Sequence, residues 1–282
     1  MKLLKVVPLF VMVLVLLGCS FTVAVPTVQT GSTEILNINE AYPANVASPI
    51  LEINMGAGTL NLSSGADALV SGEVHYNVTD WKPTVTQTSS GLTLSQKQTK
   101  DIGFPSGDIV NDWTLKLGKN PFGLKIAAGA YTGTLDFSGV PLTSLEVSDG
   151  ASKSTLLFNT PNPSTMSSLV YKTGASQVSI VGIGNANVSD VSFNSGAGAY
   201  SLDFTGTLQQ DILCTIKTGV SDLKLILPKE AHSIITVTGG LGNVNATGAW
   251  NITGSTYETG SGSPTINIQG EMALGNLVLS QK

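Results

Sequence analysis

Residues 169–180 read Leu-Val-Tyr-Lys-Thr-Gly-Ala-Ser-Gln-Val-Ser-Ile, with apolar side chains alternating on both sides of Gly174. The alternating apolar residues are, in order, Leu169, Tyr171, Val178 and Ile180. Alternation with a period of two is typical of a strand that buries one face. This stretch therefore predicts two strands joined by a turn at the glycine.

The same arrangement recurs along most of the chain. From Gly129 onward the turn glycines follow one another at intervals of 20 to 24 residues. The turn glycines are Gly56, Gly129, Gly150, Gly174, Gly196, Gly219, Gly240 and Gly260. Apolar or aromatic side chains occupy fifteen of the sixteen positions five and three residues before these glycines. The spacing to the apolar pair after each glycine changes only by two residues, which keeps the same side chains facing inward. We infer a repeat of about 22 residues with two strands and one glycine turn.

A unit of two strands cannot bury its apolar face alone, whereas stacked units share one apolar column. We therefore predict an all-β protein whose repeats stack as a β-solenoid, resembling a β-helix. Glycine at each turn supplies a positive φ or allows close backbone approach. Asn and Thr are expected to stack on the outer face. An antiparallel meander or sandwich with hairpins at the same glycines is the alternative.

Two regions depart from the period. Between Asp67 and Lys119 the sequence predicts separate strands at 68–78, 84–88, 92–96 and 113–117, with an irregular loop at 100–112. We interpret residues 49–118 as an N-terminal β subdomain that covers the open edge of solenoid repeats at 119–282. The last unit, around Met272 to Leu279, is shortened, as expected of a terminal cap.

The N-terminus predicts export and a lipid anchor. Lys2 and Lys5 precede an uncharged apolar run of 13 residues that ends in Leu-Leu-Gly-Cys at Cys19. The run is too short to span a membrane, and the motif resembles the lipobox of bacterial lipoproteins. We predict a signal peptide at 1–18, lipidation of Cys19 and a tether at 19–48. The chain would then lie in the cell envelope, on the outer face of the cytoplasmic membrane or in an outer membrane. An ordinary secretory signal with an incidental cysteine is the alternative.

Composition restricts the partners. The 282 residues include 14 Lys, no Arg and 19 acidic residues, and only 12% of the residues are charged. Nucleic-acid binding requires a basic surface, and the formal net charge of −5 argues against it. Ser, Thr, Asn and Gly make up 109 positions, which argues against a helical bundle. The expected partners are the membrane, through the lipid on Cys19, and a polymer or protein of the cell envelope.

The sequence contains no motif for catalysis, a metal or a cofactor. His75 lies opposite the apolar face of its predicted strand, and His232 lies between two predicted strands. Neither histidine has a nucleophile or carboxylate at the spacing of a known triad. Cys214 occupies an inward position of its repeat and is expected in the core. We therefore predict no catalytic residue and no metal site.

Two further alternatives involve sugars. Asp136 and Asp203 lie between apolar residues of equivalent strands, and a carboxylate pair is the minimum that a glycosidase needs. A polysaccharide-active enzyme would use this pair. Tyr131 and Tyr200 lie just after turn glycines, where aromatic rings could stack on sugars.

Two stretches carry a family resemblance. Leu-Glu-Ile-Asn-Met-Gly-Ala-Gly-Thr-Leu-Asn-Leu at 51–62, followed by Ala-Leu-Val-Ser-Gly-Glu at 68–73 and Tyr76, resembles the N-terminal motif of toast-rack domain proteins. Residues 219–248 are similar to the C-terminal domain of LiaF-type cell-wall stress regulators and to β-helical adhesins. The resemblance implies a β-rich fold and an envelope location, and it carries no active site.

These observations predict a non-enzymatic, lipid-anchored envelope protein that acts as an adhesin-like or structural interaction module. An envelope-stress sensing or regulatory lipoprotein related to LiaF-type proteins is the alternative. LiaF-type regulators carry transmembrane helices, and this chain shows a lipobox instead.

Overall fold

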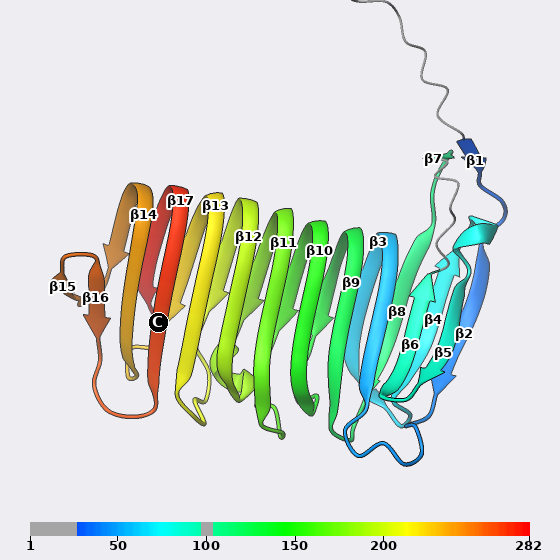
Figure 1. The fold of residues 1–282 in the computed structure, drawn as a ribbon, viewed down its shortest axis with the longest axis horizontal. Helices are drawn as coiled ribbons and strands as arrows, with labels where there is room; N and C mark the ends of the chain where they lie inside the picture. The colour runs from blue at the N-terminus through cyan, green and yellow to red at the C-terminus, as the bar shows by residue number, and fades with distance from the viewer. Residues whose placement is uncertain (1–26, 97–103) are drawn as a thin grey trace, which may run out of the picture.

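The computed structural model describes residues 27–96 and 104–282. Long strands bend at one edge of the molecule, and loops at the opposite edge lead from one strand to the next (Figure 1). Each bent strand with its loop forms one coil, and parallel ladders join neighbouring coils. Parallel pairing rules out a meander of antiparallel hairpins. The protein is an all-β solenoid, as the glycine repeat predicts.

Long strands of 15 to 17 residues form the coils. They are β3 (Ile50–Ala66), β9 (Phe122–Asp136), β10 (Leu142–Leu157), β11 (Met166–Val181), β12 (Val188–Asp203), β13 (Ile212–Leu227), β14 (His232–Thr247) and β17 (Thr265–Gln281). The half before each bend lies in one wall of the solenoid, and the half after it lies in the other. Along the stack the order is β3, β9, β10, β11, β12, β13, β17 and β14.

Close approach between coils explains the glycines at the bend. Gly56, Gly129, Gly150, Gly174, Gly196 and Gly219 stack in one column. A Cβ at Gly174 would lie 2.4 Å from the carbonyl oxygen of Gly150, and the neighbouring glycines meet similar oxygens at 2.4 to 2.9 Å. None of these six has a positive φ. Glycine is therefore needed at the bend because the backbones of neighbouring coils approach closely, and not because of a positive φ.

Apolar side chains fill the space between the two walls. In register, Leu124, Leu145, Leu169, Val191, Cys214 and Ile268 form one inward row before the bend. Leu135, Leu156, Ile180, Leu202, Leu225 and Leu279 form an inward row after it. All of these side chains are buried. Burying them drives folding, since each contributes about 1.5–3 kcal/mol.

Four short strands close the N-terminal end. β6 (Gly91–Gln96) pairs with the first half of β3, and β8 (Asn111–Gly118) pairs with the second half. β5 (Pro83–Thr88) then covers β6, and β4 (Val70–Tyr76) covers β8, both antiparallel. These four strands lie where the sequence predicts them, between Asp67 and Lys119. Because β3 pairs with both the cap and β9, the ladder continues across the expected boundary at 118/119.

The segment expected as a tether at 19–48 is partly folded. β2 (Glu34–Glu40) pairs antiparallel with β4 along its whole length. β1 (Thr27–Gln29) pairs in parallel with β7 (Phe104–Ser106). The apolar stretch Ile-Leu-Asn-Ile at 35–38 is short, but pairing with the edge of β4 is enough to make these residues a strand. The tether prediction therefore does not hold for residues 34–40, and residues 19–26 lie outside the described residues.

The last coil in sequence is not the last coil in space. β17 lies between β13 and β14 and pairs with both in parallel (Figure 1). The expectation that the final unit forms the terminal cap is therefore wrong. Side-chain volume explains the order, because Leu277 and Leu279 of β17 are fully buried between two neighbours. Their register partners on β14, Val244 and Ala246, are smaller and only partly buried at the end.

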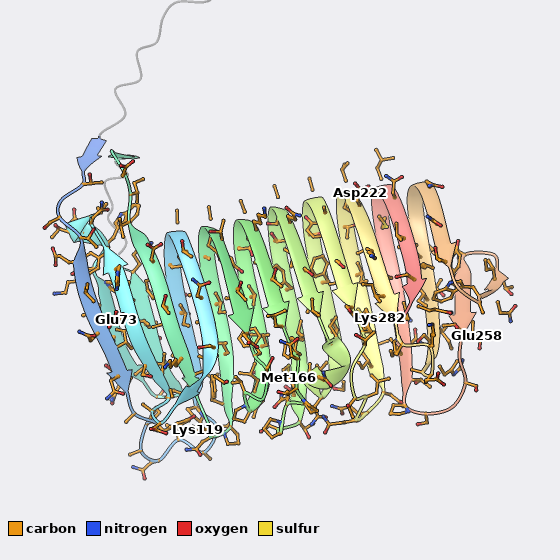
Figure 2. All side chains as sticks on the ribbon, turned by 180° about the vertical axis from the view of Figure 1, so that it is seen from behind. Glu73, Lys119, Met166, Asp222, Glu258 and Lys282 are labelled. Atoms are coloured by element: carbon orange, nitrogen blue, oxygen red, sulfur yellow. The ribbon has the colours of Figure 1, made fainter. Side chains whose placement is uncertain are left out.

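A small hairpin lies beyond β14. β16 (Thr256–Thr259) pairs antiparallel with Ser233–Thr236 of β14, and β15 (Asn251–Thr253) pairs with β16. Gly260 follows β16 in a loop with φ +68 and does not lie in the column of bends. The bend of β17 instead contains Ala273, opposite Gly240. Figure 2 shows Glu73 in the N-terminal cap and Glu258 in this hairpin, at opposite ends of the molecule.

Candidate functional site

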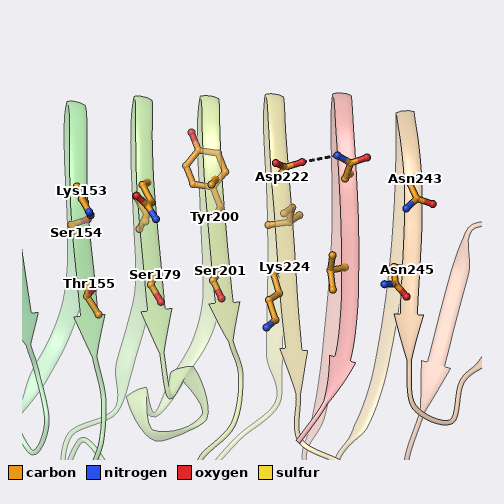
Figure 3. A pocket seen from close by; sticks show the side chains of 16 residues that line it. Lys153, Ser154, Thr155, Ser179, Tyr200, Ser201, Asp222, Lys224, Asn243 and Asn245 are labelled. Atoms are coloured by element: carbon orange, nitrogen blue, oxygen red, sulfur yellow. Dashed lines mark hydrogen bonds between the residues drawn. The ribbon is translucent and has the colours of Figure 1, made fainter.

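A shallow groove crosses the outer face of the solenoid. It has a volume of about 610 Å³ and lies on the halves of β10, β11, β12, β13, β17 and β14 that follow the bend. Figure 3 shows that its side chains come from consecutive coils, at matching heights on each strand. The parallel register makes this possible, because equivalent residues of successive coils lie about 4.8 Å apart.

Two rows of side chains line the groove. The upper row, nearer the bend, consists of Lys153, Gln177, Ala199, Asp222, Asn276 and Asn243. The lower row consists of Thr155, Ser179, Ser201, Lys224, Val278 and Asn245. Amides make up half of the upper row, and hydroxyl and amide groups make up four of the six residues of the lower row. The groove therefore offers regularly spaced hydrogen-bonding groups on a rigid ladder.

Small side chains create the hollow. Ala199 of the upper row and Ser201 of the lower row lie at its centre, on β12. Lys153 stands on one side, and Asp222 and Lys224 stand on the other (Figure 3). Asn276 donates a hydrogen bond to Asp222 Oδ1 at 2.7 Å, which fixes the amide and engages the carboxylate.

The carboxylates proposed for a glycosidase lie apart from each other. Asp136 is on β9 and Asp203 is on β12, three coils away, so the two are separated by roughly 14 Å. Inverting glycosidases separate their carboxyl groups by at most about 9.5 Å. Each aspartate also serves its own loop: Asp136 accepts a hydrogen bond from the Ser138 amide, and Asp203 accepts one from the Thr205 amide. The two do not form a catalytic pair.

The histidines and the cysteine lie far from one another. His75 Nε2 is 3.1 Å from Glu73 Oε2 on the N-terminal cap. His232, which begins β14 instead of lying in a loop, has Nε2 at 2.8 Å from Glu258 Oε1. Cys214 is fully buried, and burial raises the pKa of its thiol. Within residues 27–96 and 104–282, no group of three or more His, Cys, Asp or Glu side chains could hold a metal ion.

The expected sugar-stacking tyrosines are core residues. Tyr131 and Tyr200 are both buried, so the suggestion that they project from turns is wrong. Tyr200 donates a hydrogen bond to the Ala197 carbonyl at 2.7 Å, across the bend of its own strand. Strand alternation explains why they are buried. Tyr131 lies two residues and Tyr200 four residues after the turn glycine, and both positions face inward.

A buried polar cluster lies beneath the bends, and the sequence analysis did not identify it. Tyr171 donates a hydrogen bond to Asp149 Oδ2 at 2.7 Å, and Ser154 Oγ lies 2.9 Å from the same tyrosine oxygen. Thr173 also donates to Asp149. Burial raises the pKa of Tyr131, which contacts Tyr171, to about 12. Several Ser and Thr side chains thus face inward, whereas an outer position was expected for this type of residue.

This cluster had one signal in the sequence. Asp149 directly precedes Gly150 and has the same parity as Leu145 and Val147, so alternation alone places it inside. Its hydrogen bonds join β10 to β11 and are satisfied within the protein. The cluster therefore stabilises the bend and leaves the groove as the candidate for binding.

Residues 1–18 and the predicted lipidation residue Cys19 lie outside the described residues. Among the residues that are described, no helix is long and apolar enough to cross a membrane.

Comparison with known proteins places the chain in a family. The family model described as the N-terminal domain of toast_rack matches residues 27–180, more than half of the chain. No curated protein matches the chain.

Several solved structures are similar to it. A candidate cell adhesion protein from Clostridium sporogenes is 22% identical, with a TM-score of 0.48, and the match covers 89% of this chain and 99% of that one. A candidate adhesin from Parabacteroides merdae is 10% identical, with a TM-score of 0.39 and coverage of 90% and 99%. One from Bacteroides fragilis is 11% identical, with a TM-score of 0.34 and coverage of 89% and 99%.

The matched residues form the N-terminal cap and the coils from β3 to β11. The motif at 51–62 that resembles toast-rack proteins forms the first coil, with its bend at Gly56. The chain belongs to the family of proteins that contain the toast_rack N-terminal domain.

Proposed function

We propose that this protein is a non-enzymatic, adhesin-like protein of the cell envelope, which binds an envelope polymer or protein through the groove on β10 to β14. The observation that carries this proposal is the groove itself. It presents ordered rows of hydroxyl and amide groups on a continuous sheet, and its centre is hollow. Rigid, regularly spaced polar groups suit recognition of an extended partner, since little side-chain entropy is lost on binding.

The placement of reactive side chains supports a role without catalysis. His75 and His232 lie at opposite ends of the solenoid, and neither lines the groove. Cys214 is enclosed in the core. The groove residues lack the base and nucleophile within hydrogen-bonding reach that covalent catalysis uses.

The lipid anchor at Cys19 is part of the proposal. The described chain begins at Thr27, beside the N-terminal cap (Figure 1). An anchor eight residues earlier would hold the cap toward the membrane, and the groove on later coils would lie farther out. We expect Cys19→Ser to abolish metabolic labelling with a fatty-acid analogue. Labelling that persists in this variant would contradict lipidation at Cys19.

Binding can be tested with a soluble fragment, residues 27–282, which includes the β2 strand of the cap. The fragment should retain a component of the cell envelope in a pull-down. Ser201→Trp fills the centre of the groove and should abolish retention. Ser192→Trp lies on the other half of the same strand and is the matched control, so retention should persist. Equal loss in both variants, or no retention by the parent fragment, would contradict the proposal.

A regulatory role related to LiaF-type proteins is the second candidate. It rests on the resemblance of residues 219–248, which include the second half of β13 and all of β14. Deletion of the gene should then change the response of the cell to cell-wall antibiotics. An unchanged response would remove this candidate and leave the binding role intact.

A further inference from the structure

We infer that the groove binds an acidic linear polysaccharide that lies along the solenoid axis and crosses successive coils. This inference rests on the proposed function, and it names the chemical class of the partner. The acid groups of the polymer would be carboxylates or phosphates, both of which carry the negative charge that the groove lysines recognise.

The first argument is charge. Lys153 and Lys224 line the groove, and neither forms an ion pair within the described residues. Two lysines elsewhere have acidic partners: Lys172 pairs with Glu146 at 2.8 Å, and Lys119 pairs with Asp67 at 2.6 Å. The groove lining holds these two cations and a single acidic residue, Asp222, so it is net positive in a chain whose net charge is −5, and it favours a negatively charged partner.

The second argument is the state of the groove carboxylate. Asp222 is the acidic residue of the groove lining. Its Oδ1 accepts a hydrogen bond from the Asn276 side-chain amide at 2.7 Å. This hydrogen bond offsets part of the negative charge of the carboxylate, but the remaining charge should still oppose an anionic ligand. Removing the charge of Asp222 should therefore strengthen binding, whereas removing the charges of the lysines should weaken it.

The third argument is length. Lys153 is on β10 and Lys224 is on β13, so three coils, roughly 14 Å, separate them. A single small anion cannot reach both. An extended polymer can, and the hollow at Ala199 and Ser201 accommodates its units between the two lysines.

The fourth argument is the chemistry between the lysines. Hydroxyl and amide side chains such as Ser179, Ser201 and Gln177 match the hydroxyl groups of sugars. Val278 gives an apolar contact for a sugar ring. A nucleic acid carries far denser charge than two lysines can neutralise. The groove thus favours a sugar polymer with widely spaced acid groups.

The experiment measures binding of the full chain, purified in detergent, to immobilised polymers of matched backbone. Polygalacturonate and its methyl ester differ only in the carboxylate charge. Phosphorylated dextran and unmodified dextran form the second pair. We expect binding to at least one charged member and much weaker binding to its neutral counterpart. The pair that responds identifies the acid group, and added salt should weaken the binding.

Matched variants locate the site. Lys153→Gln combined with Lys224→Gln should weaken binding by roughly 5- to 30-fold, as expected for the loss of two exposed charge contacts. Lys125→Gln combined with Lys217→Gln removes the same charge from the other wall and should leave binding unchanged. Asp222→Asn should strengthen binding, because it removes a repulsive charge and keeps a hydrogen-bonding group toward Asn276.

The outcomes separate this inference from the proposed function. Equal binding to charged and neutral polymers, or equal loss in the two lysine pairs, would overturn the inference. So would a failure of both charged polymers to bind while Ser201→Trp still abolishes retention of an envelope component. In that case the proposed function would stand, with a partner of different chemistry.

Discussion

At the scale of single residues, the bend is the most demanding position of the fold. The backbone of one coil passes so close to the next that a Cβ would overlap a carbonyl oxygen of the neighbouring coil. Glycine is therefore selected for space at Gly150, Gly174, Gly196 and Gly219, and not for a left-handed backbone. The residue immediately after each glycine points outward, where side-chain size matters little.

Gly174→Ala should reveal this restriction. The new methyl group would lie 2.4 Å from the Gly150 oxygen, and the two coils must separate to relieve the overlap. We expect a loss of about 1–3 kcal/mol in the free energy of unfolding, measured by urea titration. Ala175→Val, at the exposed neighbouring position, is the control and should change the stability by less than about 0.5 kcal/mol. Similar effects in the two variants would argue against close approach as the reason for glycine.

Tyr131 should make the stability depend on pH in alkali. Burial raises its pKa from 10.0 to about 12, so the folded protein retains the proton after the unfolded chain has lost it. The contribution is full below pH 10 and is lost as the pH rises from 10 through 12. Between these limits we expect the parent to lose about 2–3 kcal/mol more than Tyr131→Phe, measured by urea titration at each pH. Parallel pH profiles for the two proteins would contradict this.

At the scale of elements, the arrangement of the last three coils is set by how completely each can be buried. β17 has large inward side chains and occupies an interior place with a neighbour on each side. β14 has smaller ones after its bend and lies at the end. The β15–β16 hairpin covers the first half of β14, and Trp250 packs against Tyr257 at an interplanar angle of 85° beside it.

Engineered disulfides can test this order. Lys224 and Val278 are register partners on β13 and β17, so cysteines at both positions lie at the spacing of adjacent strands and should oxidise readily. Cysteines at Lys224 and Asn245 are two coils apart, roughly 9.6 Å, and should stay reduced. Non-reducing electrophoresis distinguishes the two. A disulfide in the second pair only would show that β14, and not β17, adjoins β13.

At the scale of the whole molecule, the solenoid has two unequal ends. The N-terminal end is closed over both walls by β5 and β4, and β2 adds a further strand. At the other end β16 covers the first half of β14, while the outer edge of residues 242–247 has no strand partner in the described part of the chain. Stability in such stacks depends on nearest neighbours, so it should be lowest where a neighbour is missing.

Hydrogen exchange should follow this gradient. Backbone amides of β10, β11 and β12 have coils on both sides and should exchange most slowly. Amides in the second half of β14 should exchange much faster than those in its first half, which β16 covers. Mass spectrometry of peptides from the two halves provides an internal comparison. Equal protection of the halves would indicate that something covers the open edge.

Much of this fold is encoded locally. The alternation around Gly174, repeated with the same parity in other units, indicates strand, bend and strand within a single unit. It also placed Cys214 in the core, where it lies. The pattern fails at Gly260, because this loop glycine between β16 and β17 is also followed by an apolar pair, Ile266 and Ile268.

The candidate site was harder to predict from the sequence than the fold was. Each groove residue, such as Ala199 or Lys224, is an ordinary outward residue of its own strand. The groove exists because parallel register brings residues as far apart as Lys153 and Asn245 onto one surface. Similarly, the hydroxyl groups around Asp149 became a buried cluster only through contacts between coils.

The amino-acid pattern alone thus specified the coil, because alternation and the need for glycine act within a single unit of about 22 residues. Which coil lies beside which was decided by packing between units, since every coil offers a similar apolar row and only side-chain volume and end coverage distinguish them. The order β13, β17, β14 and the groove that crosses these strands are consequences of that packing.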